Sequence, residues 1–479
     1  MNDLDTRFAP FEARMRAEGL PDLFIRTFRH YYAQLLTGET GLIPEADIEP
    51  VRDLPDAEQL DAHYADVGRA HRDKIVFIKL NGGLGTSMGL QKAKSLLPVK
   101  NGLTFLDIIA RHALHHGIRL VLMNSFNTRA DSLALLKRYP DLWGDIPLDF
   151  LQHKAPKVRQ DTLEPVSWPA NPALEWAPPG HGDIYTALVT SGMLQTLLDH
   201  GIEYAFVSNS DNLGAALDDA IFGYFIEQRL PFMMEVADRT PADRKGGHLA
   251  RRRSDGQLIL RESAQCPEED AAAFQDVSRH RYFNTNNLWY HLPSIQRALE
   301  EREGILGLPL IVNKKTVDPR DPDSIPVYQL ETAMGSAIAV FQGAQALRVP
   351  RSRFSPVKTT NELLAVRSDA FLLTDDYRVT LHPERRGRAV VVDLDKRYYK
   401  LIDEFDKRFP DGPPSLLHCD KLVVRGDVVF VGDGKLVFHG EVEIVNEDPD
   451  PYLFDEEQAE LYLGHEHDHD HDHGLFLDA

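Results

Sequence analysis

The chain is poor in cysteine and has no long apolar segment. Its two cysteines, Cys266 and Cys419, lie in unrelated contexts, so neither a disulfide framework nor a zinc site is indicated. No run of apolar residues is long enough to cross a membrane, and the charged amino terminus does not resemble a signal peptide. These absences argue against a disulfide-stapled secreted domain and a membrane-spanning protein. We expect a cytoplasmic protein without a membrane partner.

Basic residues are missing from one part of the chain. The 479 residues include 53 Lys and Arg against 74 Asp and Glu, for a net charge of −21. Residues 447–479 contain no Lys or Arg and hold twelve of the acids, so the rest carries only about −9. An acidic chain of this kind is not expected to bind nucleic acid. Anionic substrates would therefore have to be met by local lysines.

Composition and the pattern of apolar residues along the sequence predict four regions. Residues 1–73 read as a helical region, residues 74–369 as the main domain, residues 370–446 as a small β-rich domain, and residues 447–479 as an acidic, His-rich tail. In the main domain short apolar strands alternate with helices, which predicts a parallel or mixed sheet with covered faces. The expected strands are 74–80, 118–123, 203–208 and 232–236, and the expected helices are 104–116, 130–138 and 183–200.

A glycine-dense loop, residues 79–89, directly follows the first expected strand. Glycines at such a position let the backbone approach a phosphate without side-chain clashes. The loop does not match the dinucleotide fingerprint, because the glycine after Gly83 and Gly85 is Gly89, one residue late, and it lacks the P-loop ending. The alternative is a tight strand-to-helix turn that binds nothing. Lys92 and Lys94 close behind the loop favour the phosphate interpretation.

Polar residues also follow two of the other expected strands, at 124–127 and 209–212. In α/β sheets ligands bind beyond the carboxyl ends of the strands, so three such clusters favour a ligand site over simple turn chemistry. Asp211 could coordinate Mg²⁺ or cap the following turn. His181, in a Pro/Gly loop, could contact a ligand or its own loop. Lys358, at a helix entrance, could face an anion, although a surface role is common for lysine.

The β-rich domain contains two similar stretches fourteen residues apart, 422–430 and 436–444. They predict either one or two coils of a β-helix or an ordinary hairpin pair. The last part of the chain alternates His with Asp or Glu over residues 465–473. It could bind transition metals weakly, but a solvated, disordered tail is the simpler prediction.

Taken together, the glycines, lysines, asparagines and single aspartate suit phosphate transfer, in which a protein mainly positions reactants and neutralises charge. In these residues the chain resembles a known family, the eukaryotic-type UTP–glucose-1-phosphate uridylyltransferases (UDP-glucose pyrophosphorylases). The matching segments run in the family's order over about residues 74–369: KLNGGLGTSMG from Lys79, LMNSFNT from Leu122, PPGHGDIY from Pro178, VSNSDNLGA from Val207, FNTNNLW from Phe283, IVNKKT from Ile311, QLETAMG from Gln329 and VPRSRFSPVKTTNELL from Val349.

The resemblance implies an α/β fold, with a Rossmann-like mixed-sheet nucleotidyltransferase domain, a helical N-terminal region and a small C-terminal β-helix-like domain. It implies reversible uridylyl transfer from UTP to glucose 1-phosphate, giving UDP-glucose and pyrophosphate, with Mg²⁺. The implied catalytic residues are Lys358 and Lys94, and the implied metal ligand is Asp211. The implied nucleotide contacts are Leu80, Gly82, Gly83, Lys94, Gln152, Gly180, Asp211 and Lys358. The implied substrate contacts are Gly82, Gly83, His181, Asn209, Ser210, Asp211, Asn286 and Glu331.

The chain departs from the family pattern in three places. Ala93 stands where the family usually has a proline before the lysine that corresponds to Lys94, so rigidity is lost there. Ser210 replaces the usual isoleucine, and the C-terminal β element looks shortened, which leaves a homo-oligomer open. Two other functions stay open as well: the same chemistry on another sugar 1-phosphate, and a nucleotide sensor that keeps the fold without turnover.

Overall fold

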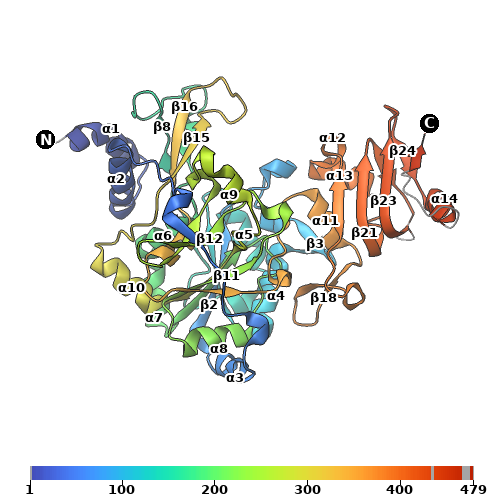
Figure 1. The fold of residues 1–479 in the computed structure, drawn as a ribbon, viewed down its shortest axis with the longest axis horizontal. Helices are drawn as coiled ribbons and strands as arrows, with labels where there is room; N and C mark the ends of the chain where they lie inside the picture. The colour runs from blue at the N-terminus through green and yellow to red at the C-terminus, as the bar shows by residue number, and fades with distance from the viewer. Residues whose placement is uncertain (1–2, 433–435, 467–474, 478–479) are drawn as a thin grey trace.

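The computed structural model describes residues 3–432, 436–466 and 475–477, and it is built on one large mixed sheet (Figure 1). Along its main path the strand order is β1-β12-β14-β10-β2-β5-β6, while β11 pairs with β14 and β17, and β13 pairs with β12. The predicted α/β class with a mixed central sheet is confirmed. The strands are β1 Ile48–Pro50, β2 Ile75–Asn81, β5 Arg119–Asn124, β6 Asp149–Leu151, β10 Tyr204–Asn209, β11 Phe232–Asp238, β12 His248–Arg252, β13 Leu258–Arg261, β14 Tyr282–His291 and β17 Gln345–Arg348.

Strand direction brings the expected site segments to one edge of this sheet. β2 pairs in parallel with both β5 and β10, and β5 pairs in parallel with β6. β14 is antiparallel to β10 and to β11, so β11 and its parallel partner β17 run the same way as β2. The carboxyl ends of these strands therefore face the same side, where the glycine loop and the later polar segments begin.

The predicted helices form with one exception. α4, Phe105–His116, begins at a capping box between Thr104 and Asp107 and ends at Gly117, whose φ is 65°. α5, Arg129–Leu136, also forms near its expected place. The single helix expected over 183–200 is wrong: it is divided into α6, Ile184–Thr190, and α7, Met193–Asp199. The break falls at Gly192, which has a φ of 78° and so cannot continue a right-handed helix.

The first 73 residues form α1 Asp3–Ala17, α2 Asp22–Leu36 and α3 His63–Ala70, and they also supply one strand of the main sheet. β1 pairs antiparallel with β12. α3 packs against α8, Asp219–Glu227, so closely that a Cβ added at Gly68 would lie 2.0 Å from the Asp219 carbonyl oxygen. This region is thus joined to the main domain through β1 and α3. The division of the chain into four parts stays a prediction.

The C-terminal part lies at one side of the main sheet, drawn in orange and red in Figure 1. It begins with α11 Thr360–Arg367 and the hairpin β18 Phe371–Leu373 and β19 Val379–Leu381. Its strands form two parallel sheets: β20 Val391–Leu394, β21 Ser415–Arg425, β23 Val437–Asn446 and β25 Leu475–Leu477 in one, and β22 Val428–Phe430 and β24 Tyr452–Phe454 in the other.

Parallel pairing shows that the hairpin alternative for the two similar stretches is wrong. Leu422 lies opposite Val442, whereas the fourteen-residue alignment would pair it with Leu436. Parallel neighbours need a crossover between them, and β22 occupies part of that connection. The β-helix-like description stays a prediction.

The first part of the predicted tail packs against the C-terminal part. Phe454 of β24 and Ala459 of α14, Glu456–Glu466, are buried in the same apolar cluster as β21 and β23. The His/Asp run lies largely outside the described residues. Across the described parts of the chain, no helix is long and apolar enough to cross a membrane.

Candidate active site

The carboxyl ends of β2 and β5 are cross-linked by asparagine side chains. Asn81 lies opposite Asn124 in the β2–β5 register. The Asn81 Nδ2 group donates to Asn124 Oδ1 at 2.7 Å and to Ser132 Oγ at 2.8 Å, and all three side chains are buried. These two asparagines therefore hold the strands together and face no ligand. Asn209, opposite Leu80 at the end of β10, is only partly buried.

The glycine loop brings Gly82 against Gln152, two of the predicted nucleotide contacts. A Cβ on Gly82 would lie 2.3 Å from Gln152 Oε1, so only glycine fits while the Gln152 side chain keeps this position. The Ser125 hydroxyl donates to the Gly82 carbonyl at 2.9 Å, and the Gln152 amide donates to the Asn124 carbonyl at 2.8 Å. A Cβ on Gly83 would meet nothing within 4 Å. The loop thus packs on Gln152 at Gly82 and is open at Gly83.

Lys94 and Asp211, far apart in sequence, form an ion pair at the mouth of this loop. Lys94 Nζ lies 2.8 Å from Asp211 Oδ2, and both side chains are about one-fifth exposed, at 19% and 20%. The Lys94 amide donates to the Gly83 carbonyl at 3.2 Å, and the preceding Ala93 forms an antiparallel bridge with Leu84. That bridge holds the segment in which the family proline is missing.

Lys358 is placed beside Asp211 by its backbone. The amide of Val357, the residue before it, donates to the Asp211 carbonyl at 3.1 Å. The Lys358 amide donates to Glu362 Oε1, within the capping box that starts α11. Lys358 itself is exposed, and its ammonium makes no hydrogen bond or ion pair within the described chain. The structure thus gathers a paired lysine, a carboxylate and an uncommitted lysine at one sheet edge.

A second group of predicted contacts forms where the Pro/Gly loop meets β16, Pro326–Glu331. The Gly182 amide donates to the Thr332 carbonyl at 2.9 Å, and a Cβ on Gly180 would lie 2.2 Å from the same oxygen. Gly180 has a φ of 81°, a conformation that favours glycine. It also lies against Glu331, since its added Cβ would be 3.2 Å from Glu331 Cβ. Burial raises the pKa of Glu331 above its usual value, opposed by a hydrogen bond from Asn313.

His181 is held in one tautomer. The Met334 amide donates to His181 Nδ1 at 2.9 Å, so the ring proton resides on Nε2, which is left as a donor. Burial lowers the pKa of His181 to about 4, so the ring is neutral at pH 7. It can therefore donate a hydrogen bond to a ligand without adding a charge.

Asn286 sits on a bulge in β14. Between Met234 and Val236 of β11, the register on β14 moves from Leu288 to Asn284, which leaves extra residues on β14. Asn286 has a φ of 60°, and its amide donates to Asn284 Oδ1 at 2.8 Å. The bulge lies near the His181 group, because a Cβ on Gly335, next to Met334, would be 2.6 Å from Asn284 Nδ2.

The predicted residues therefore fall into two groups, and no hydrogen bond or ion pair joins their side chains within the described residues. One contains Leu80, Gly82, Gly83, Lys94, Gln152, Asn209, Ser210, Asp211 and Lys358, and the other contains Gly180, His181, Asn286 and Glu331. Residues not predicted from sequence lie behind both: Asn212, Glu235, Asn287 and Arg353. The signal for Glu235 was a charge within the apolar run of β11.

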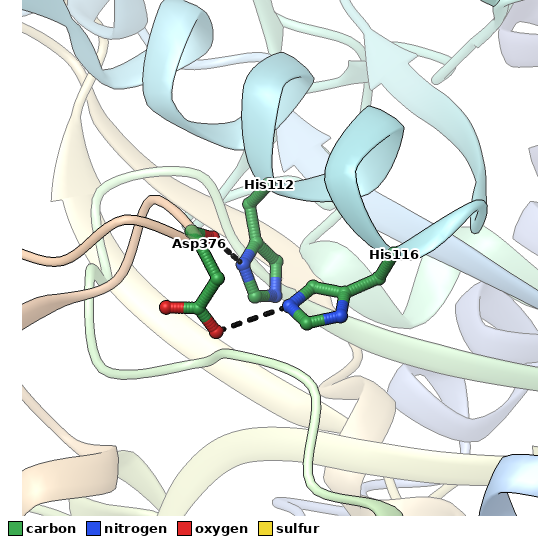
Figure 2. A group of neighbouring side chains, drawn as sticks. All are labelled: His112, His116 and Asp376. Atoms are coloured by element: carbon green, nitrogen blue, oxygen red, sulfur yellow. Dashed lines mark hydrogen bonds and ion pairs between the residues drawn. The ribbon is translucent and has the colours of Figure 1, made fainter.

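A separate cluster, His112, His116 and Asp376, has the composition of a metal site (Figure 2). The Leu217 amide donates to His112 Nε2 at 3.1 Å, so the His112 proton is on Nδ1, which donates to the Asp376 carbonyl at 2.8 Å. His112 then has no free lone pair for a metal. Burial lowers its pKa to about 3, which keeps the ring neutral. His112 thus ties α4 to the β18–β19 turn.

Comparison with known proteins shows the family of the chain. The family model described as UTP–glucose-1-phosphate uridylyltransferase matches residues 23–436. A probable UTP–glucose-1-phosphate uridylyltransferase of Schizosaccharomyces pombe is 41% identical over 76% of this chain and 71% of the relative. The Saccharomyces cerevisiae enzyme of that name is 38% identical over 91% of this chain and 86% of the relative.

Solved structures give the same result. A mutant of UDP-glucose pyrophosphorylase from Leishmania major has a TM-score of 0.88 and 45% identity, covering 95% of this chain and 97% of that one. Another mutant of that protein, in complex with UDP-glucose, has a TM-score of 0.85 and 45% identity, covering 94% and 96%. The identities extend over most of both chains. This chain therefore belongs to the UTP–glucose-1-phosphate uridylyltransferase family, whose members are nucleotidyltransferases.

Proposed function

We propose that this protein transfers a uridylyl group reversibly from UTP to glucose 1-phosphate, giving UDP-glucose and pyrophosphate. Family membership supports the reaction class. One observation supports a role for particular residues, namely the contacts of Asp211. Its side chain pairs with Lys94, and its backbone carbonyl accepts a hydrogen bond from the Val357 amide. These contacts bring the glycine loop, a carboxylate and two lysines together, and transfer of a uridylyl group between two anionic substrates requires such positive charge near the phosphates.

The nucleotide is assigned to the first group of residues. Gly83 and the backbone at Leu80 approach the nucleotide, and the Gln152 side chain, fixed against Gly82, reads the base together with Gly180. Lys94 and Lys358 neutralise the phosphates as the sugar phosphate oxygen attacks the α-phosphorus in line and pyrophosphate leaves. Since phosphoryl-type transfer depends on positioning and charge, these lysines supply most of the catalysis.

The sugar phosphate is assigned to the second group together with Asn209 and Ser210. His181 donates a hydrogen bond from Nε2, Asn286 contacts a sugar hydroxyl from its bulge, and Glu331 accepts from another. A neutral donor suits this place, because burial lowers the pKa of His181 to about 4 and so keeps the ring uncharged near pH 7. In this proposal His181 orients the substrate through that hydrogen bond.

Mg²⁺ fits the donor set at Asp211. Within the described residues, Asp211 Oδ2 is paired with Lys94 while Oδ1 makes no hydrogen bond or ion pair. One free carboxylate oxygen beside phosphate positions is the arrangement that Mg²⁺ prefers, with the remaining ligands from phosphate and water. Bound there, the ion would neutralise phosphate charge. Asp211 would hold it, and Lys94 would keep that carboxylate oriented.

The test is release of pyrophosphate from UTP and glucose 1-phosphate with Mg²⁺, with UDP-glucose identified as product. Glucose 1-phosphate should give the highest kcat/KM among sugar 1-phosphates. Lys358→Ala should remove most turnover, while Lys421→Ala, an exposed lysine on β21, serves as the matched control. UTP binding with no product from the unaltered chain would refute the enzymatic proposal in favour of a sensor.

A further inference from the structure

A buried carboxylate outside the predicted site connects three of its segments. Glu235, in the middle of β11, is fully buried. Its Oε1 accepts from Arg353 Nε at 2.6 Å and from Asn287 Nδ2 at 3.2 Å, and its Oε2 accepts from Arg353 Nη2 at 2.9 Å and from Trp289 Nε1 at 2.8 Å. Four donors satisfy the carboxylate, and the Arg353 contact is the two-pronged kind that fixes orientation.

The first connected segment is the bulge that carries Asn286. The Thr285 hydroxyl donates to the Glu235 carbonyl at 2.7 Å, and Asn287 donates to the Glu235 side chain. Both neighbours of Asn286 are thus bonded to one residue. Because the bulge is held at the residue on each side of Asn286, the backbone of Asn286 between them is fixed in place.

The second and third segments are those of Lys358 and Asp211. The Arg353 carbonyl accepts from Asn212 Nδ2 and Asn287 Nδ2, each at 3.1 Å. Asn212 Oδ1 accepts from the Ser355 amide at 2.8 Å and the Gly214 amide at 3.0 Å. Arg353 Nη1 also donates to the Ala216 carbonyl at 3.1 Å. The chain that directly follows Asp211 and the chain that leads to Lys358 are therefore both bonded to Arg353, the partner of Glu235.

We infer that Glu235 and Arg353 are positioning residues that set the relative places of Asp211, Asn286 and Lys358 during turnover. The inference rests on the proposed function. Neither residue is assigned a contact with substrate; each acts through the segments that it holds. A satisfied, buried network keeps a single geometry, and displacement of reacting groups by about 1 Å can cost about a hundredfold in rate.

The test is Arg353→Lys, which keeps the buried positive charge but removes the fork that bonds Glu235 and Ala216 together. The matched control is Arg261→Lys. Arg261 is also buried and, like Arg353, donates to a carboxylate, Glu45, at 2.5 Å, yet it joins β13 to the N-terminal region and to none of the site segments. Arg353→Lys should lower kcat about ten- to a hundredfold, with KM for UTP within about twofold. Arg261→Lys should lower the melting temperature and leave both constants within about twofold.

A second variant covers failure of Arg353→Lys to fold. Asn212→Asp keeps the two acceptor bonds to Ser355 and Gly214 but loses both donor bonds from Nδ2, so the same fall in kcat is expected from it. A folded Arg353→Lys or Asn212→Asp with unchanged kcat would overturn the inference, as would an equal fall in kcat in Arg261→Lys. Absence of product with the unaltered chain would instead refute the proposed function, and the inference with it.

Discussion

The buried side chain of Lys79, next to the site, allows a direct test of a lowered lysine pKa. It lies within β2, just before the glycine loop, and its side chain is buried. The ammonium donates to Ser208 Oγ at 2.7 Å and to the Ala215 carbonyl at 3.1 Å, and among the described residues no carboxylate pairs with it. Burial, with a smaller contribution from the charge of Arg353, lowers the pKa of Lys79 to about 7.

The magnitude follows from the two pKa values. In the unfolded chain the pKa is 10.5, so between pH 7 and 10.5 the unfolded state binds more protons than the folded state, and stability must rise with pH. Burying the charge costs about 5 kcal/mol at pH 6 and about 2 kcal/mol at pH 9. The Lys79→Met variant has no such cost. Its advantage over the unaltered protein should therefore shrink by about 3 kcal/mol between these pH values.

The assay is urea unfolding of both proteins at pH 6 to 9, followed by tryptophan fluorescence, since Trp289 packs within 4.4 Å of Phe206 (ring centroids) in the same sheet. Other titrating groups cancel in the difference between the two proteins. Lys421→Met, on the exposed side of β21, should show no change with pH. A difference between Lys79→Met and the unaltered protein that stays constant from pH 6 to 9 would refute the reasoning, because Lys79 would then titrate normally.

Four further outcomes are expected from the site. Lys358→Ala should lower kcat about 10²–10³-fold without changing the melting temperature, since its exposed ammonium bonds no other described group; steady-state kinetics and a thermal scan check this. Gly82→Ala should raise KM for UTP at least about tenfold, as its Cβ displaces Gln152. The kcat ratio of the unaltered protein to His181→Gln should stay flat from pH 6 to 8 and change only toward pH 4; an inflection at 6.5 would contradict the assigned neutral ring. Glu331→Gln should raise KM for glucose 1-phosphate, measured by pyrophosphate release, and leave KM for UTP unchanged.

Much of the fold could be predicted because local and global signals agree along the strands and caps. Uninterrupted apolar residues mark β2 and β5 as strands buried on both faces, and Thr104 and Gly117 mark the ends of α4. The break at Gly192 was missed because glycine inside a helical pattern costs only about 1 kcal/mol, so it stops a helix only when the surrounding packing requires a left-handed residue. The register of β21 on β23 could not be predicted, because register depends on crossover length as well as on similarity between strands.

The sequence does not show which of the asparagines at the strand ends can contact a ligand. Asn81, Asn124 and Asn209 occupy equivalent places after three parallel strands, so sequence alone treats them alike. In the structure Asn81 and Asn124 bond to each other and are buried, while Asn209 stays partly exposed. The difference comes from spacing between strands: two side chains in register on neighbouring strands satisfy each other. Only the sheet order decides which asparagine is left for a ligand.

The same reasoning explains why Glu235 could not be assigned from sequence. A carboxylate in an apolar strand must be paired, because burying it alone would cost more than the fold can offset. That requirement predicts a cation, yet it does not say which of the chain's 53 Lys and Arg residues supplies it. The structure identifies Arg353, five residues before Lys358, and so turns a packing requirement into a constraint on the site. Residues proposed to contact substrate can be recognised in the sequence as motifs. The pair that holds those motifs in place can be recognised only in the structure, where β11, β14 and the Lys358 segment lie together.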